Sequence, residues 1–344
     1  MKFNKETIEK VTRELIEVPS PVSYYDEIHP KMEELAQSFG YMITYDRKRT
    51  AYIYIEGKDK TKTVCVGAHI DTLGLMVRSI HSNGTLALRN LGGINYNNLE
   101  GCTCKIHTRD QKVYTGTIAC QSHSSHVFDD ARSRVRDEHN MMVILDEFVS
   151  NEEDVRALGI EHGDIISIDP NYQYTEKGFI KSRFIDDKAA VGAVFAVLEY
   201  LKQHNITPLY NTLFAFPIYE EIGHGGAYLP PEVSEYVALD IGLIGPGYSG
   251  NEFKVSICAK DNYTPYDRAL TSRLIRLAKE NDIDYCVDVF YRYGSDASAA
   301  IRAGNNVYAA AFGMGCFSTH GYERCHIQAI EETAKLLYAY LTQE

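Results

Sequence analysis

Hydrophobic residues recur at helical spacing near both ends of the chain and at strand spacing through its middle. Ile8, Val11, Leu15 and Ile16 fall on one helical face and predict a helix over 4–17. From about 76 to 172 the chain instead consists of short apolar runs separated by turn residues. Outside that segment the pattern predicts helices over 26–39, 188–204, 265–281, 296–303 and 326–342, and strands within 41–56 and over 63–69, 212–219, 236–240, 253–259, 285–290 and 307–312.

This change of pattern predicts two structural domains. Strands and helices alternate over 1–75 and 173–344, which is typical of an α/β domain. The short strands of 76–172 predict a small β-barrel or sandwich inserted into that domain. With 344 residues, of which 44% are hydrophobic, the chain is long enough to bury a large core.

The charge balance narrows the choice of partner and compartment. The chain has 47 acidic and 35 basic residues, a net charge of −12 and no lysine- or arginine-rich run, so we expect no nucleic-acid partner. The first residues lack an apolar signal core and no stretch of about 18 apolar residues occurs, so we expect a soluble, cytoplasmic protein without membrane contact. The eight scattered cysteines form no CxxC pair and are expected as reduced, mostly buried thiols.

The adjacent carboxylates Glu220 and Glu221 carry the clearest chemical signal. They follow the apolar run 212–219 and precede a glycine-rich segment, Ile222-Gly-His-Gly-Gly226. Two neighbouring carboxylates repel each other, and burial increases the repulsion, so a cation is expected beside them. On an extended chain the two side chains would point to opposite sides, so that one could bind a metal while the other served as general base.

Other acidic or imidazole groups also follow predicted strands, where open α/β sheets place their active sites. His69 can face a metal while Asp71, two residues on, accepts from its other ring nitrogen. Of the pair Asp186 and Asp187, one could cap the following helix and the other could bridge two cations. Asp240 follows the strand predicted over 236–240 and is a further candidate ligand.

Imidazole groups near the C-terminus complete this set. His320 could close the shell of a second metal, and His326, which is expected to begin the final helix, is its competitor. The segment Ser122-His-Ser-Ser-His126 is interpreted as a surface loop, with metal binding as the alternative. Histidine and carboxylate ligands without thiolates are typical of catalytic rather than structural zinc-like sites.

In order and spacing, these motifs resemble those of the dinuclear metallo-aminopeptidases that include tetrahedral and glutamyl aminopeptidases. The resemblance covers essentially the whole chain and implies a zinc-peptidase-like α/β/α sandwich with a mixed central sheet. It also implies that 76–172 forms a β-barrel dimerisation domain and that the dimers assemble into dodecamers. The matching motifs are Gly67-Ala-His69-Ile-Asp71-Thr, Asp186-Asp-Lys188, Glu220-Glu-Ile-Gly223, Leu239-Asp240 and Gly294-Ser-Asp296-Ala.

The resemblance also implies a role for each candidate residue. Two divalent ions are expected, Zn²⁺ or Co²⁺ with Mn²⁺ as a further candidate, and Glu220 would be the general base. The peptide bond between Asp186 and Asp187 would be cis. One metal would be held by His69, Asp186 and Asp240, and the other by Asp186, Glu221 and His320.

The expected reaction is hydrolysis of the N-terminal residue from a peptide by metal-activated water. His224, Arg292, Ser295 and Asp296 are candidates for shaping the substrate pocket. The alternatives are a deacylase or dipeptidase acting on a modified small peptide, and a metal-free binding or scaffold protein. A scaffold protein on this fold would be expected to lack at least one metal ligand or the general base, and this sequence retains all of them. A glycosidase is disfavoured because the chain has no tryptophan and its carboxylates accompany histidines.

Overall fold

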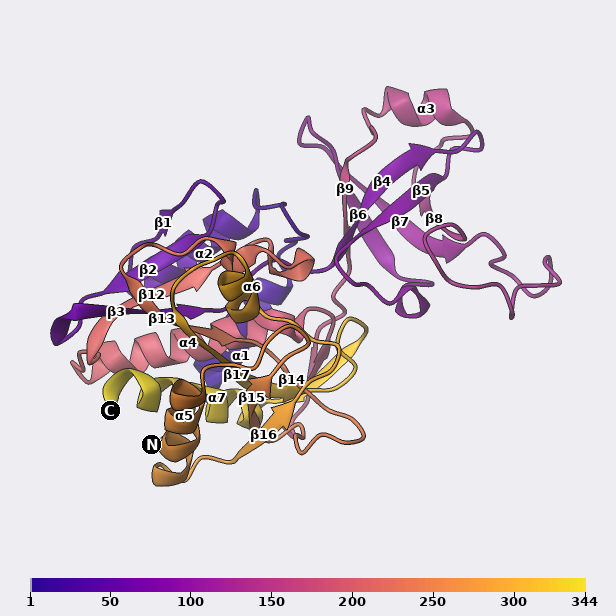
Figure 1. Cartoon of the computed structure of the whole chain (residues 1–344). Coiled ribbons are helices and arrows are strands. Elements are labelled where there is room, and N and C mark those ends of the chain that lie inside the picture. The colour runs from indigo at the N-terminus through magenta and orange to yellow at the C-terminus, as the bar shows by residue number, and fades with distance from the viewer. Residues whose placement is uncertain (1) are drawn as a thin grey trace. The chain divides into compact units, whose positions relative to one another are not determined.

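The computed structural model describes residues 2–344 and divides them into two compact units (Figure 1). The α/β unit comprises the chain up to Thr72 together with Asn171–Glu344, and the barrel unit comprises Leu73–Pro170. Over residues 2–344, every helix is too short or too polar to reach across a lipid bilayer.

The α/β unit is built on a mixed sheet whose strand order is β1-β2-β12-β3-β13-β17-β15-β16, with β14 paired to β17. The strands β12, β3, β13 and β17 run parallel to one another, whereas β2 and β15 are antiparallel to their neighbours in this central group. The sheet strands are β1 (Thr44–Tyr45), β2 (Ala51–Ile55), β3 (Asp59–Gly67), β12 (Tyr210–Phe216), β13 (Val233–Leu239), β14 (Gly242–Leu243), β15 (Val255–Lys260), β16 (Tyr285–Val289) and β17 (Tyr308–Cys316).

Helices cover both faces of this sheet. One core contains side chains from α1, α2, α4, α5 and α7, and the core on the opposite face contains Ala297 and Ala300 from α6. Helix α4 is apolar on nearly all sides because it is enclosed between the sheet and other helices. The helices are α1 (Lys5–Ile16), α2 (Ile28–Ser38), α4 (Ile185–Gln203), α5 (Arg268–Glu280), α6 (Asp296–Arg302) and α7 (Ile327–Thr342). These layers confirm the predicted α/β/α sandwich.

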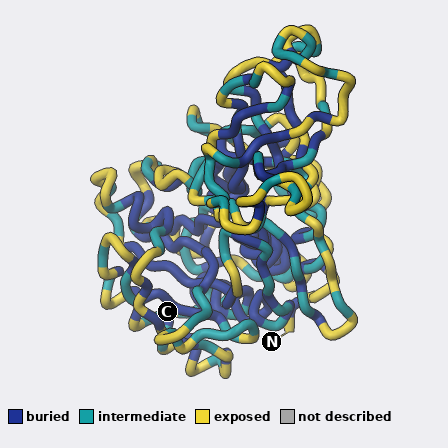
Figure 2. Tube along the Cα trace, turned by 90° about the vertical axis from the view of Figure 1, so that its right-hand side faces the viewer, coloured by how far each residue is buried: buried dark blue, intermediate teal, exposed yellow. Residues whose placement is uncertain are grey.

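The barrel unit closes on itself in the order β4-β5-β8-β7-β6-β9, with antiparallel pairing between neighbours. Closure pairs the strand edges that an open sheet would expose. The elements are β4 (Gly74–Ile80), β5 (Leu86–Leu91), η1 (Tyr96–Asn98), β6 (Thr103–His107), β7 (Val113–Cys120), β8 (Met141–Leu145), α3 (Glu152–Ala157) and β9 (Ile165–Ile168). Figure 2 shows buried chain in the interior of each unit and exposed chain along its loops.

Two local predictions need correction. The strand predicted over 212–219 ends at Phe216, and Glu220 and Glu221 lie in the short 3₁₀ helix η2 (Glu220–Ile222). Pro217 explains the early end, because proline cannot donate a backbone hydrogen bond to a neighbouring strand. A small sheet of β10 (Gln173–Tyr174), β11 (Phe179–Ser182) and β18 (Glu323–His326) also forms where no strand was predicted.

Candidate dinuclear metal site

The topology of the sheet brings the predicted site residues to one edge. Strand β3 lies between β12 and β13, and all of them run parallel. Their C-terminal ends therefore meet, and they lead into His69, Glu220 and Asp240 respectively. Asp186 is at the start of α4, and His320 follows β17, which is parallel to β13.

The carboxylate of Asp186 lies between the two histidines. Its Oδ1 is 3.1 Å from Nε2 of His69, and its Oδ2 is 3.7 Å from Nε2 of His320. Nε2 of His320 is also 3.5 Å from Oε2 of Glu221. Each oxygen of a single carboxylate thus faces a different imidazole, which is the arrangement that a carboxylate bridging two cations requires.

Within residues 2–344, potential ligand atoms converge to within 4.8 Å of one another in three overlapping groups. These groups contain every ligand that the resemblance implied except His320, and they additionally include Glu220 and Asp187. The groups are His69, Asp186 and Glu221; His69, Glu220 and Asp240; and Asp186, Asp187 and Asp240.

The buried Asp187 tests whether a cation fits here. Its side chain is fully buried, and neither carboxylate oxygen has a hydrogen-bond partner. An unpaired buried carboxylate is costly, and the cost falls when a cation binds next to it. The donors are imidazole nitrogens and carboxylate oxygens, which suit zinc, cobalt and manganese. The residues present therefore fit a divalent metal centre. The bond joining Asp186 to Asp187 is cis, as the resemblance implied.

Asp71 has a contact that the sequence did not indicate. Its carboxylate accepts hydrogen bonds from the backbone N–H groups of Glu220, at 3.2 Å, and Glu221, at 3.1 Å. Nδ1 of His69 is 3.0 Å from the backbone oxygen of Asp71 and 3.5 Å from its carboxylate. Asp71 thus connects the imidazole to the turn that holds both glutamates.

The 3₁₀ turn gives the two glutamates different surroundings. The side chain of Glu220 is 12% exposed and its Oε2 is 3.8 Å from Nε2 of His69. The side chain of Glu221 is only 3% exposed and faces His320. The predicted separation of their environments is thus present, but it comes from a turn with about three residues per turn rather than from strand alternation.

Electrostatics in the cluster favour a bound cation. Burial, together with repulsion from neighbouring carboxylates, raises the pKa of Glu220, Glu221, Asp187 and Asp240 well above the usual range. Burial also acts to raise the pKa of Asp186, but the hydrogen bond and charge of His69 outweigh it and lower the pKa.

The pKa of His69 is raised, in contrast to that of Asp186. Burial acts to lower its pKa, but hydrogen bonds to Asp186 and Asp71 outweigh burial and raise the pKa well above its ordinary value. Without metal, the cluster therefore holds protons that a cation would displace.

The two C-terminal histidines differ in their distance from the cluster and in their hydrogen-bond partners. His326 lies outside the cluster, because its Nε2 donates to the backbone oxygen of Lys177 at 2.8 Å and its Nδ1 caps α7 by accepting from the N–H of Gln328 at 3.1 Å. His320 lies in the turn between β17 and β18, beside Asp186. The segment Ser122–His126 is in the loop after β7, with both of its histidines exposed, as expected.

Two buried residues beside the cluster were not predicted as site residues from the sequence. Nζ of Lys188 donates to Oγ of Ser20 at 2.6 Å, and that hydroxyl donates to the backbone oxygen of Ile70 at 2.7 Å. Burial lowers the pKa of Lys188 to about 7. Glu323 is also buried and accepts from the backbone of Asp186. Only the Asp-Asp-Lys motif marked Lys188 in the sequence, and no signal marked Glu323.

The candidate pocket residues differ in their positions. His224 is exposed and its ring stacks on Tyr219 with centroids 4.9 Å apart, whereas Arg292 is exposed without a described ion pair to this cluster. Ser295 is buried as the N-cap of α6. Asp296 is buried, and its Oδ1 accepts from the N–H of Gly226 at 2.5 Å. Burial raises the pKa of Asp296 to about 7. Asp296 thus binds the glycine-rich segment that follows Glu221, and Ser295 caps the helix that carries Asp296.

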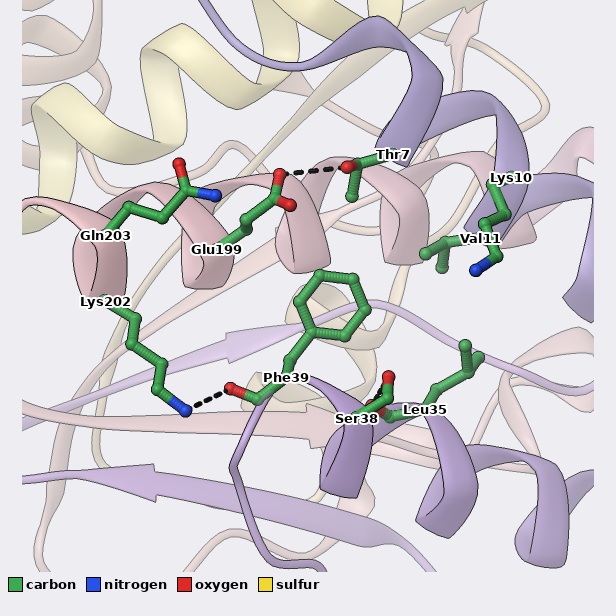
Figure 3. Close-up of a pocket in the computed structure, with 9 residues that line it drawn as sticks. All are labelled: Thr7, Lys10, Val11, Leu35, Ser38, Phe39, Glu199, Lys202 and Gln203. Atoms are coloured by element: carbon green, nitrogen blue, oxygen red, sulfur yellow. Dashed lines mark hydrogen bonds between the residues drawn. The ribbon is translucent and has the colours of Figure 1, made fainter.

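A separate surface hollow of about 520 Å³ is lined by side chains from α1, α2 and α4 and contains no residue of the cluster (Figure 3). Within it Lys202 donates to the backbone oxygen of Phe39 at 2.8 Å, and Thr7 donates to Glu199 at 2.9 Å. Its polar groups are thus largely paired with one another.

Known proteins resemble this chain in sequence and in fold. A sequence model of the M42 glutamyl aminopeptidase family matches residues 50–336. The Bacillus subtilis (strain 168) protein named "Putative aminopeptidase YhfE" is 39% identical over 338 residues, covering 98% of this chain and 97% of its own.

Solved structures share the fold at lower identity. Aminopeptidase APDkam598 from Desulfurococcus kamchatkensis is 19% identical, with a TM-score of 0.88 over 99% of this chain and 96% of its own. The Pyrococcus horikoshii TET1 peptidase is 20% identical, with a TM-score of 0.84 over 98% of this chain and 99% of its own. Because the family model spans most of the sequence and a full-length relative is 39% identical, the chain belongs to the M42 glutamyl aminopeptidase family.

Proposed function

We propose that this metal-dependent aminopeptidase removes N-terminal residues from peptides at a centre that holds two divalent metal ions. The disposition of Asp186 carries the proposal, because its two carboxylate oxygens face His69 and His320 separately. A single-metal site needs only one of these oxygens. Asp240 would complete the shell on the side of His69, and Glu221 would complete it on the side of His320.

Bound metal ions would lower the pKa of a water molecule and polarise the carbonyl of the substrate, and Zn²⁺, Co²⁺ and Mn²⁺ all suit this donor set. Glu220 is the proposed general base. Its carboxylate is beside His69 and is more exposed than that of Glu221, so substrate and water can reach it. A raised pKa suits a group that must take a proton and return it to the leaving amine.

Asp71 is proposed as a positioning residue. By accepting from the N–H groups of Glu220 and Glu221, it fixes the turn on which both carboxylates depend. Its backbone oxygen also orients the ring of His69. The surplus of carboxylates around this turn favours a substrate with a cationic amino terminus over one whose amine is blocked.

The direct test has two parts. Metal analysis after dialysis should find about two equivalents of divalent metal in each chain, and fewer than one would contradict the proposed centre. Aminoacyl arylamides should then be compared with the same compounds N-acetylated, each with added Zn²⁺ or Co²⁺. Preferential release of the arylamine from the unblocked series supports an aminopeptidase, whereas release of acetate from the acetylated series with the arylamide bond intact would replace it with a deacylase.

For assembly and location we propose a cytoplasmic homo-oligomer in which barrel units form dimers and the dimers build a dodecamer. Apolar side chains exposed on the barrel unit support such an interface, with Phe148 wholly exposed and Val113 and Val127 more than half exposed. The related TET1 peptidase of Pyrococcus horikoshii is described as assembling into a tetrahedron or a large octahedral shell. Among residues 2–344 the cysteines are free thiols, in keeping with a reducing compartment. Sedimentation velocity of the wild type and Phe148→Lys tests the interface, because the variant should sediment as a smaller species.

A further inference from the structure

A buried carboxylate joins two parts of the proposed metal centre that are far apart in sequence. Glu323 is the first residue of β18 and is only 2% exposed. Its Oε2 accepts from the backbone N–H of Asp186 at 3.1 Å, and its Oε1 accepts from the backbone N–H of His320 at 3.2 Å. One side chain therefore fixes the backbone at both residues.

The turn that contains His320 needs such an anchor. Phe317 and Arg324 exchange backbone hydrogen bonds of 2.8 and 3.0 Å, which close the turn at its base. Within the turn Ser318 and His320 have φ angles of 60° and 62°, a left-handed backbone conformation that residues other than glycine rarely adopt. The hydrogen bond from the N–H of His320 to Glu323 holds the backbone in this conformation and aims the imidazole towards Asp186.

The chemistry of a carboxylate suits this position. In its ionised form both oxygens accept hydrogen bonds, so it can bind the two N–H groups without presenting a donor of its own. A glutamine of the same shape would turn its NH₂ group towards one of these N–H groups. That contact would place two donors opposite each other in a buried environment, where an unsatisfied polar group is costly.

We propose that Glu323 is a positioning residue of the metal centre that orients Asp186 and His320 through their backbone amides. This inference rests on the proposed two-metal function. Within residues 2–344 Glu323 belongs to none of the three groups of converging ligand atoms, so its proposed effect passes through the backbone of the ligands. Side chains that orient metal ligands in this way typically change metal affinity by ten- to a hundredfold when they are replaced.

The test compares Glu323→Gln with wild type and with a matched control, Glu332→Gln. Glu332 is 5% exposed, accepts from the backbone N–H of Asp284 at 3.1 Å and pairs with Nζ of Lys335 at 2.7 Å, so the control neutralises a similarly buried carboxylate on α7 that binds neither Asp186 nor His320. Metal affinities are measured by isothermal titration of the metal-free proteins with Zn²⁺. We expect Glu323→Gln to weaken at least the lower-affinity step by tenfold or more, and Glu332→Gln to leave both steps unchanged.

Thermal unfolding of the metal-free proteins separates positioning from general stability. If both variants lower Tm by similar amounts and only Glu323→Gln loses metal affinity, the positioning role is supported. Equal affinities in Glu323→Gln and wild type would overturn the inference while leaving the two-metal function intact. A wild type that fails to bind two metal ions would overturn the proposed function instead.

Discussion

Metal binding should be strongly coupled to proton release. In the metal-free cluster, burial and neighbouring charge raise the pKa of Glu220, Glu221, Asp187 and Asp240, and hydrogen bonds raise that of His69. An imidazole must give up the proton on its ligating nitrogen before it binds a metal. We therefore expect His69 to release one proton and the coupled carboxyls to release at least one more.

The magnitude follows from linkage. Each proton displaced changes the binding free energy by about 1.4 kcal/mol per pH unit. Two protons give about 2.8 kcal/mol, so the overall metal dissociation constant should fall about a hundredfold when the pH rises by one unit near neutrality. Because the carboxyls titrate as a coupled set, the observed slope belongs to the cluster and not to a single residue.

The stability of the metal-free protein should depend on pH because of the same raised pKa values. Between the unfolded carboxyl pKa, near 4, and the raised folded values, the folded state binds more protons than the unfolded chain. Stability therefore falls as the pH rises through this interval. His69 acts in the same direction, because the stability from its raised pKa is present below about 6.5 and is lost as the pH passes its folded value.

Titration calorimetry with Zn²⁺ in buffers of different ionisation enthalpy counts the protons released. Two or more per chain at pH 6.5 are expected, with tighter binding at pH 7.5. The Tm difference between metal-loaded and metal-free protein should widen over the same range. Release of less than half a proton, together with an affinity independent of pH, would refute the electrostatic account of the site.

Further substitutions separate the roles of neighbouring residues. Glu220→Gln should retain both metals and lose about 10²- to 10⁴-fold in kcat, whereas Glu221→Gln should bind less metal after dialysis; metal loss from the first variant would contradict the assignment. His320→Ala should lose metal, whereas His326→Ala should keep it. His326→Ala should instead lose about 1 kcal/mol of unfolding free energy because its helix cap is removed. Equal metal content in the two variants would contradict this distinction. Gly313→Ala would place a methyl group 1.9 Å from the backbone oxygen of Asp240. Urea denaturation should therefore record a loss of about 1–3 kcal/mol of unfolding free energy, and an unchanged midpoint would contradict the packing.

The sequence predicted an α/β domain with an inserted β domain because helices and strands have distinct periodicities, and the family resemblance implied the α/β/α layers. It also placed His69 and Asp240 correctly at strand ends, since strands that run parallel in one sheet end at the same edge. The prediction that the strand before Glu220 continues to Tyr219 was wrong, because the apolar run extends through Ile218 and Tyr219 after the strand has ended. Pro217 was the available signal.

Other features depend on contacts that no local pattern encodes. Glu323 accepts a hydrogen bond from the backbone N–H of Asp186, 137 positions away, and β18 contains no apolar run that would have predicted a strand. The carboxylate of Asp71 binds the turn at Glu220 from 149 positions away. Nearby acidic residues can be recognised in a sequence, but which backbone N–H groups they bind depends on how the strands are ordered in the sheet.

The order of the strands has a consequence for biosynthesis. His69 precedes the barrel unit, Asp186 and Asp240 follow it, and His320 comes only after β17 near the end of the chain. In the proposed centre, a nascent chain therefore presents ligands for both metal ions only after His320 has left the ribosome.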